Sequence, residues 1–243
     1  MKSNEMTGKI ILITGATSGI GRETAFGLAD MGAKVVIMAR NAEKAAATID
    51  QIEERTGNAE TGFIKCDLAS LDSVRNAADV FRSGYKRLDV LIDNAGGVLG
   101  KRMITVDGFE QTFQVNHLSH FLLTNLLLDV LKRSAPSRIV VVGSQAHSGA
   151  HLDFEDLMLE RGYSSFKAYG RSKLANLLFC FELSRRLEGT GVTANCLHPG
   201  VVRTNFGHDL NGATKLFMPV GHLFMISPRK GASRPSTWPQ IPR

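Results

Sequence analysis

The tyrosine and the lysine in the run AYGRSK at residues 168–173 have the residue types and the spacing of a proton-transfer centre. Tyr169 and Lys173 are four residues apart, so a helix would place them on one face, one turn from each other. An ammonium group beside a phenol favours the phenolate and should lower the tyrosine pKa toward the range of an acid/base catalyst. The same spacing also arises by chance on many helices, so the pair needs support from the rest of the chain.

A glycine-rich segment near the start of the chain supplies that support. Gly15, Gly19 and Gly21 follow an apolar run and precede a helical pattern, which is the context of a phosphate-binding turn. Glycine lets the backbone turn tightly and approach a pyrophosphate, whose charge meets the helix N-terminus. A dinucleotide site is predicted here, with a plain strand-to-helix turn as the alternative. The expected contacts are Gly15, Thr17, Ser18, Gly19, Ile20 and Gly21.

The end of the second predicted strand distinguishes two dinucleotides. An NAD site places an acid at this point to bind the ribose hydroxyls, whereas this chain has Arg40 between Ala39 and Asn41. A guanidinium can pair with a 2′-phosphate, and Arg22, directly after the last glycine, could assist it. The sequence therefore favours NADP over NAD, with a solvated loop charge as the alternative role for Arg40.

Apolar runs and helical patterns alternate along the chain. Continuously apolar strands indicate a sheet covered on both faces, and strand–helix alternation indicates parallel pairing. We expect one α/β domain over residues 1–226, a doubly wound parallel sheet of the Rossmann type, with Ser70 as a helix N-cap. The predicted strands cover residues 9–14, 34–39, 61–66, 88–93, 138–143 and 192–197, and the predicted helices residues 23–31, 41–56, 70–83, 109–133 and 165–187.

Composition and charge limit the function classes. With 243 residues, of which 43% are hydrophobic and 21% charged, the chain suits one soluble α/β domain. Its net charge of +6 is mild and no basic stripe carries interleaved aromatics, so we expect no nucleic-acid partner. Residues 1–8 are polar and no apolar stretch is long enough to span a bilayer. We therefore expect a cytoplasmic protein without a signal peptide or a transmembrane segment.

The cysteines and histidines are not spaced like metal ligands. Three cysteines lie far apart without CxxC spacing and are expected to be reduced and structural. They are Cys66, Cys180 and Cys196. Four histidines are also interpreted as structural, although one, His147, is a candidate for the substrate entrance. They are His117, His120, His147 and His198, and we expect no bound metal.

Polar and small residues at the ends of the predicted strands complete a recognisable set. These residues are Asp67, Leu68, Asn94, Ala95, Gly96, Ser144, Pro199 and Gly200, with Asn116 in the long helix. Together with the glycine turn and the Tyr169–Lys173 pair, this set resembles the short-chain dehydrogenase/reductase family. The resemblance covers residues 9–231, and residues 114–147 are similar to the retinol-dehydrogenase-like branch of that family.

The resemblance implies four catalytic residues. Tyr169 would be the acid/base that gives a proton to a carbonyl oxygen or takes one from an alcohol. Lys173 would lower the pKa of Tyr169 and hydrogen-bond the nicotinamide ribose. Ser144 would hold and polarise the substrate oxygen, and Asn116 would support a water that relays protons to Lys173. Hydride would pass between the nicotinamide and the substrate carbon. We therefore expect an NADP-dependent oxidoreductase for a lipophilic, retinoid-like alcohol, aldehyde or ketone.

The resemblance also implies further cofactor contacts. Asp67 would contact the adenine edge, with a plain helix N-cap as the alternative, and Asn94 would line the adenosine side. Pro199, Gly200 and Thr204 would contact the nicotinamide end. The remaining assigned contacts are Leu68, Ala95, Gly96 and Val202.

Two positions depart from the family pattern. Asp93 stands where the family commonly has an asparagine, and Gly143 stands where this branch usually has a second serine. Neither difference removes a catalytic group.

The tail at residues 227–243 does not fit the resemblance. Pro235, Pro239 and Pro242 exclude the helix expected there, and the last strand of the family is predicted to be absent. One permitted codon choice, read in a shifted frame, encodes IYLATNPE, which suits the branch, so we hypothesise a frameshift. Coding DNA incompatible with that shifted frame would contradict it.

This tail leaves an alternative function open. A catalytically weak or inactive member could still bind nucleotide and act through protein partners. A homo-oligomer is a further alternative, and loss of the last strand would expose a sheet edge and remove the dimer surface that the resemblance implies. The apolar residues 206–225 are expected either to cover a lipophilic substrate or to pack on the core.

Overall fold

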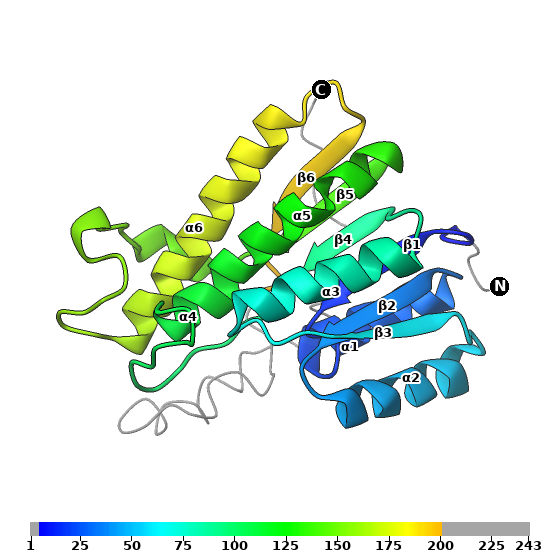
Figure 1. The fold of residues 1–243 in the computed structure, drawn as a ribbon, viewed down its shortest axis with the longest axis horizontal. Coiled ribbons are helices and arrows are strands. Elements are labelled where there is room, and N and C mark those ends of the chain that lie inside the picture. The colour runs from blue at the N-terminus through cyan, green and yellow to red at the C-terminus, as the bar shows by residue number, and fades with distance from the viewer. Residues whose placement is uncertain (1–4, 201–243) are drawn as a thin grey trace.

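A six-stranded parallel sheet forms the centre of the protein (Figure 1). The computed structural model describes residues 5–200. The strands lie in the order β3-β2-β1-β4-β5-β6, and every neighbouring pair is parallel. This order confirms the predicted doubly wound sheet of the Rossmann type. The strands are β1 (Ile10–Thr14), β2 (Lys34–Ala39), β3 (Thr61–Lys65), β4 (Val90–Asp93), β5 (Ser137–Val142) and β6 (Val192–Leu197).

Helices cover both faces of this sheet. One face carries α1 (Gly19–Asp30) and α2 (Ala42–Thr56), and the other carries α3 (Leu71–Gly84), α5 (Ser119–Arg133) and α6 (Ser165–Arg186), which lie in front of the sheet in Figure 1. Ile11 and Ile13 pack on the α1–α2 side, whereas Leu12 packs on the opposite side. Successive side chains of a strand point to opposite faces, so strands buried on both sides are apolar throughout.

The strand order reverses direction between β1 and β4. From β1 the chain builds outward through β2 and β3, and from β4 it builds in the other direction through β5 and β6. The connections that leave the carboxyl ends of β1 and β4 therefore diverge. In doubly wound sheets, this point is where a crevice for a ligand forms.

Several element boundaries differ from the predicted ones. Helix α1 begins at Gly19, before the predicted residue 23, because the glycine turn itself forms the first helical turn. The predicted helix at residues 109–133 contains α4 (Gln111–Phe113) and the π-helical turn η1 (Gln114–Leu118) before α5. The predicted N-cap Ser70 is confirmed, since its Oγ accepts from the Ser73 N–H at 3.2 Å. Short 3-10 turns, η2 (Gln145–Gly149) and η3 (Phe154–Asp156), separate β5 from α6.

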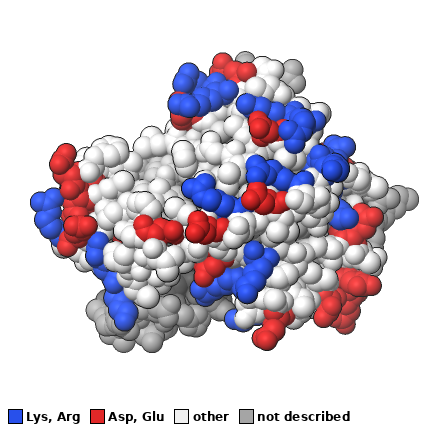
Figure 2. Space-filling model, viewed as in Figure 1, with Lys and Arg blue, Asp and Glu red and all other residues white. Residues whose placement is uncertain are grey.

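Some predictions concern residues outside the described part of the chain. The predicted domain boundary at residue 226, the segment 206–225, the tail 227–243, and the contacts Val202 and Thr204 lie there. Within residues 5–200, no helix has both the length and the apolar character needed to cross a bilayer. On the face seen in Figure 2, basic and acidic side chains of the described residues are interspersed.

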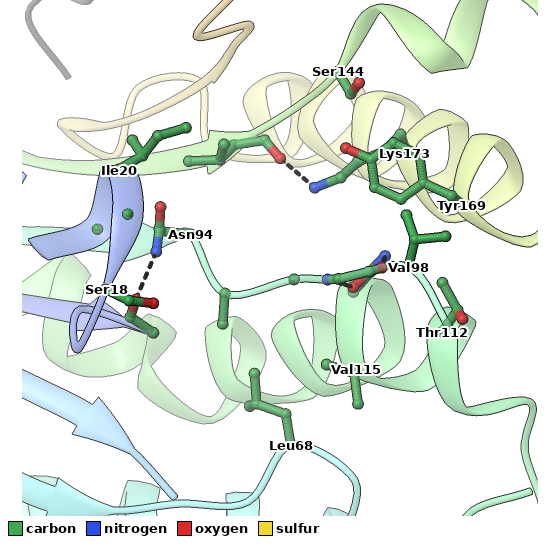
Figure 3. Close-up of a pocket in the computed structure, with 18 of the residues that line it drawn as sticks. Ser18, Ile20, Leu68, Asn94, Val98, Thr112, Val115, Ser144, Tyr169 and Lys173 are labelled. Atoms are coloured by element: carbon green, nitrogen blue, oxygen red, sulfur yellow. Dashed lines mark hydrogen bonds between the residues drawn. The ribbon is translucent and has the colours of Figure 1, made fainter. Parts of the chain in front are cut away.

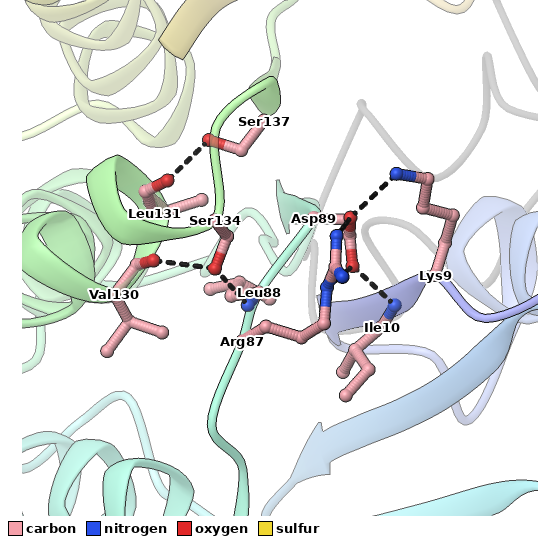
Figure 4. Close-up of polar contacts among 9 residues, drawn as sticks. All are labelled: Lys9, Ile10, Arg87, Leu88, Asp89, Val130, Leu131, Ser134 and Ser137. Atoms are coloured by element: carbon pink, nitrogen blue, oxygen red, sulfur yellow. Dashed lines mark hydrogen bonds and ion pairs between the residues drawn. The ribbon is translucent and has the colours of Figure 1, made fainter. Parts of the chain in front are cut away.

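Asp89 links the amino ends of the central strands β1 and β4, at the end of the sheet opposite the crevice (Figure 4). Its carboxylate is 3% exposed and accepts from the Ile10 N–H at 2.9 Å and from Lys9 Nζ at 3.0 Å. Arg87 also donates to both carboxylate oxygens. Burial alone would raise the pKa of Asp89, but the hydrogen bonds from Arg87, Ile10 and Lys9 outweigh it and hold the pKa below its usual value.

Replacing Asp89 with asparagine should therefore destabilise the fold in a pH-dependent way. The pKa of Asp89 is lower in the folded protein than in the unfolded chain. Its carboxylate therefore stabilises the fold fully at pH values above the unfolded-state pKa, and this stabilisation is lost as the pH falls through the folded-state pKa. We expect Asp89→Asn to lower the free energy of unfolding by about 2 kcal/mol at pH 7, and by less as pH falls from 5 to 3. Urea denaturation measures the difference. The exposed Asp79→Asn is the control and should change little, and a pH-independent loss in Asp89→Asn would contradict this account.

Asp93, at the end of β4, is a buried acid with the opposite behaviour. It is 2% exposed, and Thr124 Oγ1 donates to its Oδ2 at 2.9 Å. Its other oxygen has no hydrogen-bond partner among the described residues. Burial raises the pKa of Asp93 to about 7, although the hydrogen bond from Thr124 opposes this shift. Roughly half of the Asp93 carboxyl groups are therefore neutral at pH 7, and the neutral form, which resembles the asparagine of the family pattern, predominates below that pH.

Replacing Asp93 with asparagine should stabilise the protein more at pH 8 than at pH 5. The pKa of Asp93 is higher in the folded protein than in the unfolded chain. Its contribution to stability is therefore fully present at pH values below the unfolded-state pKa and is lost as the pH rises through about 7, whereas an asparagine does not titrate. Urea denaturation of both proteins at the two pH values provides the measurement. An unfolding free-energy difference that does not grow with pH would refute the assignment of a buried, titrating carboxyl.

Candidate active site

The carboxyl ends of the central strands open into one cavity of about 770 Å³. This volume lies within the range of small-molecule and cofactor sites. Every predicted site residue within the described part of the chain lines it, except Arg22, whose Nε lies 4.0 Å from Glu23 Oε1. The predicted residues that line it are Gly15, Thr17, Ser18, Gly19, Ile20, Gly21, Arg40, Asp67, Leu68, Asn94, Ala95, Gly96, Asn116, Ser144, Tyr169, Lys173, Pro199 and Gly200.

The glycine turn is packed too tightly for larger residues. Gly15 has a φ of +69°, and a Cβ added there would lie 2.8 Å from the Cβ of Ala95. A Cβ on Gly21 would lie 2.6 Å from the Gly15 carbonyl oxygen. Ser18 is the N-cap of α1, but its side chain makes no capping hydrogen bond. The N–H groups of the first helical turn are therefore not satisfied by Ser18, which suits an anionic ligand at this end of the cavity.

Thr14 joins this turn to the segment after β4. Its Oγ1 accepts from the N–H groups of Asn94, at 2.9 Å, and Ala95, at 3.0 Å. The Asn94 side chain donates in return to the Thr14 carbonyl oxygen at 2.7 Å. Sequence reasoning did not single out Thr14. The available signal was a polar residue at the end of an otherwise apolar buried strand.

Helix α6 carries Tyr169 and Lys173 to the other end of the cavity, where Ser144 faces them from the segment after β5 (Figure 3). Tyr169 and Ser144 are joined by a side-chain hydrogen bond. Lys173 Nζ donates to the Val142 carbonyl oxygen at 2.8 Å and lies 5.7 Å from the centroid of the Tyr169 ring. The spacing of this pair and the strand-end position of Ser144 thus bring the three polar groups together.

The predicted direction of the Tyr169 pKa shift is wrong for this structure. Burial raises the pKa of Tyr169, and the hydrogen bond with Ser144 only partly opposes the rise. Lys173 is itself 4% exposed, and its ammonium group donates to a backbone carbonyl rather than to the phenol. Burial also lowers the pKa of Lys173 to about 8, against the influence of Cys196. At pH 7, the phenol of Tyr169 is therefore neutral, and the amine of Lys173 is largely protonated.

Asn116 lies in the π-helical turn η1 and is fully engaged by protein groups. Its Oδ1 accepts from the Gly97 N–H at 2.9 Å, and its Nδ2 donates to the Gly97 carbonyl oxygen at 2.9 Å and to Ser172 Oγ at 3.0 Å. Its main-chain oxygen accepts from Asn176 Nδ2 at 3.0 Å. Asn116 therefore ties the segment after β4 to the helix of Tyr169 and Lys173. The relay water remains a prediction.

The alternative interpretation of Asp67 as a helix N-cap is wrong. Ser70 caps α3, whereas Asp67 Oδ1 accepts from the Ala69 N–H at 3.0 Å and Asp67 lines the cavity. Gly143 stands where the retinol-dehydrogenase-like branch usually has a serine. A Cβ at this position would lie 2.8 Å from Cys196 Sγ, so the cysteine side chain occupies the space that a serine would need. His147 does not line the cavity, and its Nδ1 lies 2.6 Å from the Ser144 carbonyl oxygen.

Sequence reasoning also missed part of the cavity wall. The wall opposite Tyr169 includes the segment after Gly96, the short helix α4 and the π-helical turn η1 (Figure 3). Helical spacing from Asn116 could have found Thr112 on the same face. The missed lining residues are Met38, Ala39, Cys66, Ala69, Gly97, Val98, Leu99, Gln111, Thr112, Val115, Val142, Gly143, Gln145, Ala146 and His198.

Comparisons with known proteins agree with this geometry. A family model described as short chain dehydrogenase matches residues 9–215. Retinol dehydrogenase 13 of Homo sapiens is 46% identical over 236 residues, which cover 95% of this chain and 71% of that protein. Retinol dehydrogenase 14 of Mus musculus is 49% identical over 240 residues, which cover 93% of this chain and 72% of that protein.

Solved structures show the same fold. An uncharacterized protein from Mycobacterium paratuberculosis is 37% identical, with a TM-score of 0.77, over 97% of this chain and 78% of that one. RhlG of Pseudomonas aeruginosa, solved as a complex with NADP, is 29% identical, with a TM-score of 0.74, over 96% of this chain and 90% of that one. The doubly wound sheet, the cavity and these similarities show that the chain belongs to the short-chain dehydrogenase/reductase family of oxidoreductases and to its retinol-dehydrogenase-like branch.

Proposed function

We propose that this protein is an NADP-dependent oxidoreductase that transfers a hydride between the nicotinamide and the carbon of a lipophilic alcohol, aldehyde or ketone. The observation that carries the proposal is the convergence of Ser144, Tyr169 and Lys173 on a cavity that also reaches the glycine turn. A proton-transfer group and an anion-binding turn on one cavity suit a reaction in which a dinucleotide and a small substrate meet.

Tyr169 would move the proton. In carbonyl reduction, its phenol O–H gives a proton to the substrate oxygen, and in alcohol oxidation the phenolate takes it back. Because burial holds the pKa of Tyr169 above its ordinary value, the protonated form required for reduction predominates near neutral pH. The Ser144 hydroxyl would hold the same substrate oxygen and orient it toward the phenol. The bound cofactor would supply the hydride.

Lys173 would act as a buried positive charge beside this centre. With a pKa of about 8, its ammonium group is largely protonated at pH 7 and favours negative charge on the neighbouring phenol or substrate oxygen. The hydrogen bond to the Val142 carbonyl oxygen directs one of its three N–H groups and leaves the others to contact a ribose.

Arg40 supports NADP as the cofactor. It lines the cavity directly after β2 and has no ion pair among the described residues. An acid that would bind the ribose hydroxyls of NAD is missing from this position, and a 2′-phosphate would instead meet a guanidinium. The NADP complex of the similar protein RhlG supports the same choice.

Apolar side chains support a lipophilic substrate. Val98 and Leu99, after β4, and Val115, on the long helix, line the cavity together with Leu68. Similarity to proteins named retinol dehydrogenases points in the same direction and supports a retinoid-like substrate. Burial of such side chains against a hydrocarbon substrate would exclude water from the reacting atoms.

Self-association remains a proposal that one surface supports. The outer sides of α5 and α6 carry apolar residues, and the rings of Phe121 and Phe179 are 5.1 Å apart across them. Phe121, Leu178 and Phe181 are 47%, 48% and 64% exposed, respectively, a pattern that favours contact with another protein surface.

Removal of the Tyr169 hydroxyl provides the main test. We expect Tyr169→Phe to lower kcat by about 10²–10⁴-fold without preventing NADPH binding, because only proton transfer is removed. NADPH absorbance with a series of aliphatic and polyene aldehydes and ketones measures turnover. Tyr85→Phe, which alters a tyrosine that does not line the cavity, should leave turnover unchanged. NADPH binding without turnover of any substrate would instead support the nucleotide-binding, catalytically weak alternative.

Removal of the Arg40 guanidinium tests the cofactor assignment. We expect Arg40→Ala to weaken NADPH binding by about 10- to 100-fold, the effect of losing charged hydrogen bonds, with little change for NADH. Titration of the intrinsic fluorescence of each nucleotide gives both dissociation constants. The matched control is Arg82→Ala on α3, whose partner is Asp79. Equal losses for NADPH and NADH would refute Arg40 as the reader of the 2′-phosphate.

A further inference from the structure

His120 contacts two separate parts of the site without lining the cavity. The imidazole, which is 2% exposed, lies on α5. Its Nε2 is 2.9 Å from Thr14 Oγ1 at the end of β1, and its Nδ1 is 3.1 Å from the main-chain oxygen of Asn116 in the π-helical turn. The chemistry proposed above does not use this side chain.

One tautomer of His120 satisfies all of these groups. A carbonyl oxygen can only accept, so Nδ1 must carry the proton that is donated to Asn116. In the neutral ring, Nε2 then accepts from the Thr14 hydroxyl at 2.9 Å, a shorter contact than the 3.4 Å between Thr14 Oγ1 and the Ile92 carbonyl oxygen, the other acceptor within its reach. This hydroxyl keeps its two lone pairs for the N–H groups of Asn94 and Ala95. Burial lowers the pKa of His120 to about 4, against the hydrogen bond to Asn116 and with help from Lys173 and His117, so the ring is neutral at pH 7.

The two nitrogens lead to opposite ends of the site. Through Thr14, Nε2 contacts the glycine turn and the segment after β4, which form the cofactor end. Through Asn116, Nδ1 contacts the catalytic end, because the Asn116 side chain donates to Ser172, whose Oγ donates to the Tyr169 carbonyl oxygen at 2.7 Å. A rigid ring with both nitrogens engaged fixes the separation of these two ends.

We propose that His120 is a positioning residue that fixes the distance and orientation between the cofactor end and the catalytic end of the site. Nε2 orders the turns after β1 and β4, and Nδ1 orders the π-helical turn and, through it, the helix of Tyr169 and Lys173. The effects on binding and turnover rest on the proposed function, whereas the tautomer does not.

Two amide variants separate the contributions of the nitrogens. His120→Asn places an amide near the position of Nδ1 and keeps a donor for Asn116, but it loses the contact with Thr14. His120→Gln reaches the position of Nε2 and keeps an acceptor for Thr14, but it loses the donor to Asn116. We expect His120→Asn to raise the Kd for NADPH about tenfold with little change in kcat, and His120→Gln to lower kcat about tenfold with little change in Kd, each the size of one lost hydrogen bond.

Nucleotide fluorescence gives Kd, and NADPH absorbance at saturating cofactor gives kcat. The exposed His151→Gln is the matched control and should change neither quantity. A purely structural role for His120 would shift Kd and kcat together in both variants, and that result would overturn the proposal. So would variants that leave both quantities unchanged.

The wild-type protein provides a second measurement in case the variants do not fold. Nitrogen-15 NMR of labelled histidine should show His120 neutral at pH 7 with its proton on Nδ1. A proton on Nε2, or a charged ring, would overturn the proposal. Failure of the wild-type protein to bind NADPH would count against the proposed function alone, because the tautomer is measured without a cofactor.

Discussion

The buried hydroxyl group of Thr14 is the contact on which the geometry of the site most depends. It lies where the strand order reverses, so the segments that leave β1 and β4 turn away from each other and cannot pair through the sheet. Their backbone N–H groups still need acceptors, and Thr14 Oγ1 accepts from both Asn94 and Ala95. Because Thr14 also contacts His120, one side chain connects the crevice floor with the helix that leads to the catalytic groups. Larger residues at Gly15 would separate these surfaces.

Burial also determines the chemistry that the polar groups can perform. The same apolar surroundings that order Tyr169 and Lys173 keep the phenol protonated and bring the ammonium pKa down to about 8. A positive charge without full hydration acts strongly on any nearby oxygen that gains negative charge. Asp93 follows the same rule at the end of β4, where burial raises the pKa of an acid to about 7. It can therefore occupy a position that the family commonly gives to a neutral amide.

Much of the fold could be predicted because local pattern and tertiary environment agree. All six described strands were expected, since a strand covered on both faces is continuously apolar and contrasts with the helices around it. The start of α1 was missed because glycines give no helical signal, although they occupy its first turn. The π-helical turn at Gln114–Leu118 was also missed. It depends on contacts from Asn176 and His120 to the Asn116 carbonyl oxygen, and no local pattern encodes such contacts.

The sequence by itself determined the sheet, its strand ends and the residue types that those ends present to one another. Parallel strands end at one edge, so the glycine turn, Asn94, Ser144 and the Tyr169–Lys173 helix had to gather there. Only the tertiary structure decided the protonation of Tyr169, the partner of Lys173 and the engagement of Asn116. These properties depend on burial and on distances between segments far apart in the chain. Spacing can predict that a lysine and a tyrosine share a helix face, but it does not show that the ammonium group donates to the carbonyl oxygen of Val142.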